Sequence, residues 1–218
     1  DSSAEMEMVL HTRGGRETRR EMRVLALEVQ DDGDKSMTIF DSPNDVKGTA
    51  FLSFTHNNAD DDQWLYLPAL KRVKRIASKN KSGPFMGSEF SYEDLSSFEV
   101  AEYDYRWLRD ETLNGELCFV VEVIPRDEFS GYRREIVWID QAHYRVQKIE
   151  FYDRKETLLK TLTLSDYQLH LDKFWRPVKQ SMLNARNGKG TVVYLRNYQF
   201  RTGLDEQDFT ENSLKRAR

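Results

Sequence analysis

Hydrophobic and polar residues alternate along most of this chain, in short runs that are separated by residues typical of turns. A period of two places every second side chain on one face of an extended strand, and clusters of Gly, Asn, Asp and Pro mark the ends of such strands. The spacing of the runs predicts on the order of eleven strands. The alternating segments are Met6–Thr12, Glu21–Gln30, Lys35–Asp41, Thr49–His56, Gln63–Leu67, Glu111–Leu113 with Glu116–Ile124, Arg133–Asp140, Tyr144–Tyr152, Thr157–Tyr167, Phe174–Asn184 and Thr191–Phe200.

Short turns join neighbouring segments, so we expect them to pair as an antiparallel meander. Asn114-Gly115 is the strongest hairpin signal, because both residues tolerate the positive φ of a type I′ turn. Pro177 has no amide donor and should mark an irregularity or a local edge. Helical crossovers of the kind that a parallel sheet needs are absent from the pattern. The sequence therefore predicts one mainly β domain over residues 1–218.

Two segments depart from the alternation. Ser91 is followed three residues later by Asp94, an arrangement that can cap the first turn of a helix, and we expect a short helix from about Tyr92 to Phe98. The tail from Leu204 to Leu214 is expected to form a second short helix or a closing turn.

The composition is that of a soluble globular domain, with 39% hydrophobic and 32% charged residues and a mean hydropathy of −0.74. The net charge of −4 argues against a nucleic-acid-binding protein, which usually carries a basic excess. No run of about 18 apolar residues is present, so no transmembrane helix is predicted. Cys118 is the only cysteine, and its apolar neighbours indicate a buried thiol and not a nucleophile.

Motifs for catalysis, metals or cofactors are absent from the sequence. The four histidines, His11, His56, His143 and His170, are scattered and do not have metal-ligand spacing. No phosphate-binding glycine loop and no serine nucleophile elbow occurs. We therefore predict no catalytic residue, no bound metal and no cofactor.

Glu89, Glu93 and Asp94 form one local cluster of carboxylates. Two acids beside an apolar patch can act as an acid and base pair, and an enzyme that acts on a lipid or glycan would need the three to converge at the floor of a cleft. Acidic residues also complement the dipole in the first turn of a helix. In that more common case they would face solvent.

Lys71, Arg72, Lys74 and Arg75 form a basic run. Such a run is often a solvated strand face. The functional alternative is contact with anionic lipid headgroups or an acidic partner, since each basic residue near a membrane surface contributes about 1 kcal/mol. Nucleic acid is the weakest alternative, because the aromatic residues that would stack on bases are missing from the run.

Large hydrophobic side chains flank the basic run and recur in two later segments. In most β domains such residues are core, and the alternative is that they line or gate a ligand pocket. The candidates for this binding role are Trp64, Tyr66, Phe85, Met86, Phe90, Tyr92, Trp107 and Trp138.

Two long segments carry a resemblance to a known family. Trp64–Ile76, with the sequence WLYLPALKRVKRI, and Phe85–Leu95, with the sequence FMGSEFSYEDL, resemble the bacterial outer-membrane lipoprotein-sorting-like family, relatives of the periplasmic carrier LolA and the receptor LolB. Val137–Asp140 and Tyr144–Asp153 match the same family. The likeness covers nearly the whole chain.

The resemblance implies an unclosed, strongly curved antiparallel β-barrel whose mouth is covered by short helices. It implies a periplasmic protein made with a signal peptide, and the sequence begins at Asp1 without an initiator methionine or an apolar leader. Members usually have a helical stretch before the first strand, so we expect that part of the lid is missing from this sequence. It also implies an inner-membrane exporter as a partner.

The leading hypothesis is a periplasmic carrier or receptor that binds the acyl chains of a lipid or lipoprotein, or another hydrophobic molecule, on the concave face. It would touch membranes only peripherally or transiently. Lys71, Arg72, Lys74 and Arg75 would contact headgroups or a partner protein. A second hypothesis is an adaptor that docks on a membrane transporter and has a fully packed interior. The third is the carboxylate enzyme described above.

Overall fold

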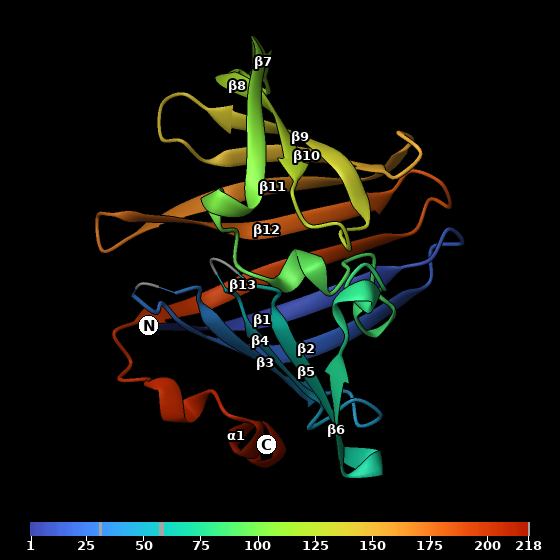
Figure 1. Cartoon of the computed structure of the whole chain (residues 1–218), viewed down its shortest axis with the longest axis vertical. Coiled ribbons are helices and arrows are strands. Elements are labelled where there is room, and N and C mark those ends of the chain that lie inside the picture. Colours follow the sequence, from blue (N-terminus) through green and yellow to red (C-terminus); the bar gives the residue numbers. More distant parts are fainter. Residues whose placement is uncertain (31, 57–58, 218) are drawn as a thin grey trace.

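Thirteen antiparallel strands form one sheet in the computed structural model of the chain, which describes residues 1–30, 32–56 and 59–217. The strands are β1 (Ser2–His11), β2 (Glu17–Leu27), β3 (Lys35–Ser42), β4 (Ala50–Phe54), β5 (Asp62–Leu67), β6 (Arg72–Ile76), β7 (Tyr103–Leu113), β8 (Glu116–Pro125), β9 (Tyr132–Asp140), β10 (Val146–Asp153), β11 (Leu158–His170), β12 (Phe174–Asn184) and β13 (Gly190–Phe200). Their order across the sheet is β6-β5-β4-β3-β2-β1-β13-β12-β11-β10-β9-β8-β7. The sheet is curved and unclosed, with β6 and β7 as its two edges (Figure 1).

This architecture confirms the expected mainly β, unclosed and curved antiparallel fold. The estimate of about eleven strands was too low for a local reason. Charged side chains on both faces of β6 hide its alternation, and Glu111–Leu113 is only the end of the eleven-residue strand β7. The hairpin at Asn114 and Gly115 is confirmed, with φ angles of 52° and 88°. Pro177 lies at a local edge as predicted, since β12 pairs with β13 only from Lys179 onward.

The register of the strands defines two faces of the sheet, because residues opposite one another in neighbouring antiparallel strands point to the same side. Met8 of β1 lies opposite Val193 of β13, and both are buried in the main hydrophobic core. We call their side of the sheet the inner face. Cys118, on the other side, is buried with Trp138 in a small outer cluster, which confirms the expectation of a buried thiol.

Residues 77–102 connect β6 to β7 and cover the middle of the inner face, and we call this segment the plug (Figure 1). It consists of irregular chain with four short 3₁₀ turns, η2 (Ser78–Asn80), η3 (Phe85–Gly87), η4 (Glu93–Leu95) and η5 (Val100–Glu102), and a further turn, η1 (Pro68–Leu70), precedes β6. Phe85 is buried against Phe40 and Phe51 of the sheet, with ring centroids 5.8 and 5.3 Å away. The plug thus completes the core that the strands alone leave open.

The predicted helix from Tyr92 to Phe98 is wrong, since only the single turn η4 forms there. Half of the capping arrangement exists, because the Ser91 amide donates to Asp94 Oδ2 at 2.7 Å. The Ser91 hydroxyl, however, bonds to Tyr132 at 2.9 Å, and the Ser97 amide donates to Thr55 Oγ1 at 3.1 Å. Bonds to the sheet therefore replace those that would have continued a helix.

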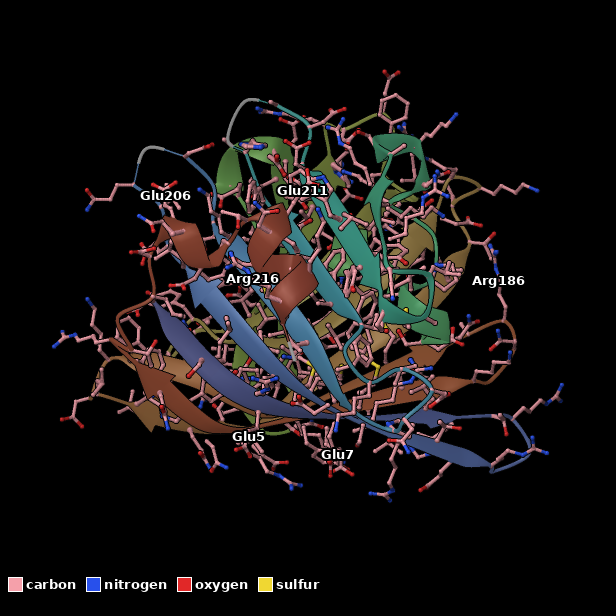
Figure 2. All side chains as sticks on the ribbon, turned by 90° about the horizontal axis from the view of Figure 1, so that it is seen from below. Glu5, Glu7, Arg186, Glu206, Glu211 and Arg216 are labelled. Atoms are coloured by element: carbon pink, nitrogen blue, oxygen red, sulfur yellow. The ribbon has the colours of Figure 1, made fainter. Side chains whose placement is uncertain are left out.

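The tail forms a 3₁₀ turn, η6 (Glu206–Asp208), and a short helix, α1 (Glu211–Arg216), as expected for this segment. Phe209 and Leu214 are fully buried against Met37 and Leu52, which lie on the outer face. Figure 2 shows the tail lying across β3 and β4, which carry Met37 and Leu52, with Glu206, Glu211 and Arg216 of the tail labelled. The only α-helix of the described residues therefore covers the outside of the sheet and not the mouth.

Of the helices in the described ranges, none is both long and apolar enough to cross a bilayer.

Candidate functional site

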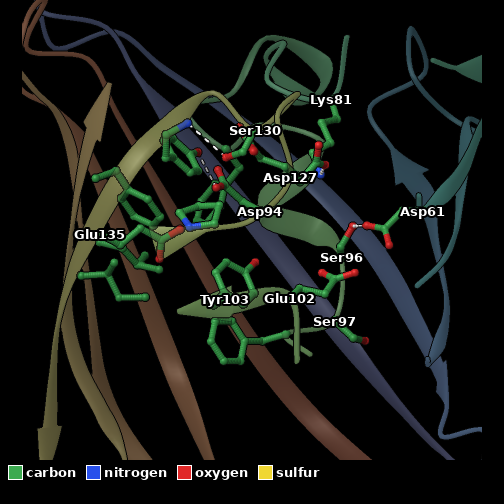
Figure 3. A pocket seen from close by; sticks show the side chains of 18 of the residues that line it. Asp61, Lys81, Asp94, Ser96, Ser97, Glu102, Tyr103, Asp127, Ser130 and Glu135 are labelled. Carbon is green, nitrogen blue, oxygen red and sulfur yellow. Dashed lines mark hydrogen bonds and ion pairs between the residues drawn. The ribbon is translucent and has the colours of Figure 1, made fainter. Parts of the chain in front are cut away.

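A cavity of about 200 Å³ lies between the plug and the inner face. One wall comes from the plug and the turns beside it, and the other comes from strands β7 to β12 (Figure 3). Ile149, Phe151 and Leu162 form the apolar part of the strand wall. Phe98 and Tyr103 line the cavity as a stacked pair, with ring centroids 4.6 Å apart.

Six carboxyl groups also line this cavity, which makes it acidic as well as apolar: Asp61, Glu93, Asp94, Glu102, Asp127 and Glu135. Two of the six are neutralised by lysines. Lys81 forms an ion pair with Asp127, and Lys160 of β11 forms one with Asp94. The remaining four have no ion-pair partner among the described residues.

Asp94 is held by a network that joins the plug to the sheet. Its Oδ2 lies 2.5 Å from Lys160 Nζ, and its Oδ1 accepts a hydrogen bond from the Tyr132 hydroxyl at 2.6 Å. Lys160 also donates to the backbone oxygen of Glu89 at 3.1 Å. Because both charges are paired and hydrogen-bonded, they can remain buried here.

Glu93 is positioned by Gly131, in the turn before β9. The Gly131 amide donates to both carboxylate oxygens, at 3.1 and 3.2 Å. A Cβ at this glycine would lie 2.7 Å from Ser82 Cβ and 2.8 Å from Glu93 Oε1, so a larger residue would displace the plug. Burial, followed by the nearby charge of Asp94, raises the pKa of Glu93 to about 7.

Glu135 of β9 is the most deeply buried of the unpaired acids, with 8% of its surface exposed. Burial raises its pKa to about 8, with the charges of Asp94 and Glu93 contributing. Burial likewise raises the pKa of Glu102 to about 7 and that of Asp61 above its ordinary value. At neutral pH the carboxyls of Glu93, Glu102 and Glu135 are therefore partly protonated, whereas an exposed glutamate would be fully ionised.

An apolar row leads away from the cavity toward the β7 edge. Trp107, Val121, Val137 and Ile149 lie opposite one another on the inner face of four neighbouring strands. Trp107 is 63% exposed, and Val121 and Ile149 are half-buried. Ile149 also lines the cavity. Val137 is buried, so the row is open at its Trp107 end and reaches the cavity at Ile149.

The structure brings four of the candidate ligand-binding residues together in the plug. Phe85 and Phe90 are buried, and Met86 and Tyr92 pack against the same main core. Only Phe90 of these lines the cavity. Trp107 lies apart from them, on the inner face of the β7 edge.

The other three candidates lie on the outer face. Trp64 and Tyr66 pack in the cluster that α1 covers, because Leu65 between them takes the inner position. Trp138 is buried in the small outer cluster and donates its indole N–H to Glu111 Oε1 at 3.1 Å.

The basic run lies at the β6 edge of the sheet, where Lys71, Arg72, Lys74 and Arg75 are all exposed. The register places Arg72 and Lys74 opposite the inner residues Leu67 and Leu65. Arg75 points to the other side and pairs with Asp62. The four charges therefore share an edge and do not form one face.

The carboxylate cluster of the sequence is divided by the structure. Glu93 and Asp94 line the cavity, whereas Glu89 lies beside it and accepts a hydrogen bond from Asn184 at 2.7 Å. Asp94 is already bound by Lys160. Within the described ranges, no group of three His, Cys, Asp or Glu side chains is arranged to hold a metal ion.

Sequence reasoning missed Glu102, Glu135 and Lys160. A signal was present for two of them. Glu135 precedes Val137 and Ile139 on the apolar side of its alternating strand, and Lys160 likewise precedes Leu162 and Leu164. A charge in that position is expensive to bury without a partner, so it indicates a polar site.

Comparisons with known proteins give a consistent result. A family model that has only the description "uncharacterized protein" matches residues 32–216. A search of curated proteins gives no match. Among solved structures, a candidate outer membrane lipoprotein-sorting protein domain from Vibrio parahaemolyticus is 56% identical, with a TM-score of 0.96 over 98% of this chain and 91% of that one.

Two further crystal structures extend the likeness. A DUF1329 family protein from Desulfovibrio piger is 30% identical, with a TM-score of 0.92 over 98% of this chain and 90% of that one. A LolA superfamily protein from Nitrosomonas europaea is 21% identical, with a TM-score of 0.79 over 97% of this chain and 90% of that one. The last of these shows a shared fold.

Proposed function

Because this chain belongs to the DUF1329 family and has a LolA-like fold, we propose that it is a periplasmic carrier or receptor for a lipid, a lipoprotein or another hydrophobic ligand. A candidate lipoprotein-sorting domain is among its relatives. We further propose that the protein is not an enzyme and releases its ligand unchanged.

The observation that carries this proposal is the apolar row from Trp107 to Ile149, which is open at its Trp107 end and reaches the cavity at Ile149. Each methylene of an acyl chain costs about 0.8 kcal/mol in water, so a lipid needs a dry surface to cross an aqueous compartment. A curved sheet with an apolar inner face supplies one.

The size of the cavity suggests how the ligand lies. At about 200 Å³, it is smaller than the roughly 300–1,000 Å³ of ordinary ligand pockets. We propose that only one end of the ligand enters the cavity, and that the rest of its chain lies along the apolar row toward Trp107.

The adaptor hypothesis requires an interior that side chains fill completely. The cavity and the open apolar row favour the carrier over this alternative. An exporter in the inner membrane fits either hypothesis, and we propose the exposed run of Lys71, Arg72, Lys74 and Arg75 as the surface that meets it or anionic headgroups.

Lipid extraction from the natively purified protein, followed by mass spectrometry, tests the proposal directly. We expect a bound lipid and saturable uptake of a fluorescent fatty acid. Val121→Asp places a charge in the apolar row and should weaken uptake by roughly tenfold or more. The matched control is Leu183→Asp on the outer face of β12, where Leu183 is 56% exposed. Absence of bound lipid, or equal loss in both variants, would overturn the carrier.

A further inference from the structure

We propose that the cavity binds a primary ammonium group, carried at the end of an apolar chain. This inference rests on the proposed function, which places the apolar chain of the ligand along the apolar row. It adds the chemistry of the ligand group that enters the cavity. The shared chemistry is an alkylammonium, whether it comes from a lipid headgroup or from a free amine.

The balance of charge in the cavity selects a cation. Lys81 and Lys160 are occupied by Asp127 and Asp94. Asp61, Glu93, Glu102 and Glu135 line the same space and form no ion pair in the described part of the chain, although the charges of Lys81 and Lys160 lie near enough to lower their pKa values slightly. An anionic headgroup would meet four carboxyls there, whereas a cation would meet its natural counter-charges.

Two buried acceptors point to a missing donor. The Glu135 carboxyl faces into the cavity (Figure 3), is only 8% exposed, and receives no hydrogen bond from any described residue. Asp61 accepts from Ser96 Oγ at 2.6 Å, but its Oδ1 is buried without a partner. Buried polar atoms in folded proteins are normally hydrogen-bonded, so both carboxyls are free to accept a hydrogen bond from a ligand that enters the cavity.

A primary ammonium fits these acceptors better than other cations do. It offers three donors on one compact atom, which suits acids that lie on different walls of a small cavity. A metal ion would need three or more ligand atoms converging on one point, and no such group exists among the described residues. The stacked rings of Phe98 and Tyr103 border the space and can accept a cation over their faces.

Proton release should accompany binding. Burial holds the carboxyls of Glu93, Glu102 and Glu135 partly protonated near neutral pH, and an ammonium would favour their charged forms. The other titratable groups around them are the carboxyls of Asp61, Asp94, Glu99 and Asp127, the paired Lys81 and Lys160, and the phenols of Tyr103 and Tyr132. Burial raises the pKa of both phenols, so they remain neutral. The affinity of the cavity for an alkylammonium should therefore rise with pH, by up to about tenfold per pH unit for each proton released on binding.

The test measures binding of dodecylammonium, dodecyltrimethylammonium, dodecanoate and ethanolamine to the whole protein by calorimetry at pH 6, 7 and 8. We expect dodecylammonium to bind about tenfold or more tightly than either long-chain analogue, with a gap that widens as pH rises. Glu102→Gln/Glu135→Gln should abolish this preference by weakening dodecylammonium binding and strengthening dodecanoate binding, because two carboxyls that attract the cation and oppose the anion are then neutral. Glu116→Gln, at the exposed start of β8, is the matched control and should keep the preference.

The outcomes separate the ammonium site from the carrier. If all long chains bind equally at pH 8, or if the double variant keeps the preference, the ammonium inference fails while the carrier stands. If ethanolamine binds to the protein but not to the Glu102→Gln/Glu135→Gln variant, and no long-chain ligand binds, the ammonium site stands and the carrier fails.

Discussion

Lys160 of β11 and Asp94 of the plug form an ion pair in which both side chains are almost completely buried, 5% and 6% exposed, with 2.5 Å between Nζ and Oδ2. The two residues are 66 positions apart in the chain. The pair joins the segment that covers the inner face to the strands beneath it, so it fixes the wall of the cavity.

Removing one partner of this pair should destabilise the protein strongly. Lys160→Met leaves a buried carboxylate without its counter-charge, and we expect a loss of about 3–5 kcal/mol in the free energy of unfolding. Urea denaturation measures it. The double variant Lys160→Met/Asp94→Asn removes both charges and keeps an acceptor for Tyr132, so it should recover most of the loss. If the double variant is as unstable as the single one, the pair is not the cause.

Stability should fall as the pH rises from about 5 to 8. Burial raises the pKa of Glu135 from the ordinary 4.5 to about 8, so the folded state binds more protons than the unfolded state across that range. The stabilisation is complete below the unfolded pKa and is lost as the pH passes through the folded value. For Glu135 alone the effect is on the order of a few kcal/mol. Urea titrations at several pH values should show a shallower slope for Glu135→Gln, and an unchanged slope would contradict the assignment.

The tail should stabilise the fold without contributing to ligand binding. Phe209 is fully buried against the outer face, and Phe209→Ala should cost about 3–5 kcal/mol through the cavity that it leaves. Uptake of a fluorescent fatty acid at low temperature should remain the same, because the inner face is untouched. Phe129→Ala, at a position that is 40% exposed, is the control for stability and should change it little.

The basic run should govern contact with anionic membranes. Reversing the charges of Lys71 and Lys74, which the structure leaves exposed, should weaken binding to vesicles that contain phosphatidylglycerol by at least about 2 kcal/mol, at about 1 kcal/mol per charge. Vesicle sedimentation at low salt measures this. The control reverses Lys155 and Lys189, which lie exposed in turns of the other half of the sheet. Equal losses in both variants would indicate only a net-charge effect.

Local sequence signals were sufficient to predict those structural features that depend on residues close together in the chain. The alternation of side chains predicted the strands, and Asn114 with Gly115 predicted a turn whose positive φ angles few other residues adopt. The order of the strands within β1 to β6 and within β7 to β13 followed as well, because hairpins pair neighbours. Only the pairing of β1 with β13 joins distant parts of the chain.

The candidate site was harder to predict from the sequence. The alternation of side chains along a strand shows which residues share a face of the sheet, but it does not show which face another segment covers. Trp64 and Tyr66 were expected beside a ligand, yet they lie on the outer face, where the tail packs. Glu135 and Lys160 were overlooked, since their roles depend on a plug that approaches from another part of the chain.

The sequence by itself determined that this protein is an antiparallel β-sheet of hairpin-linked strands, since side-chain period and turn preference act over a few residues, whereas the pairing of β1 with β13 was left to the tertiary structure. The tertiary structure alone decided which face is the interior, where the cavity lies and which acids remain unpaired in it. Burial and charge pairing arise only when distant segments meet, and the capping signal at Ser91 and Asp94 gave way to bonds with Tyr132 and Lys160 for that reason.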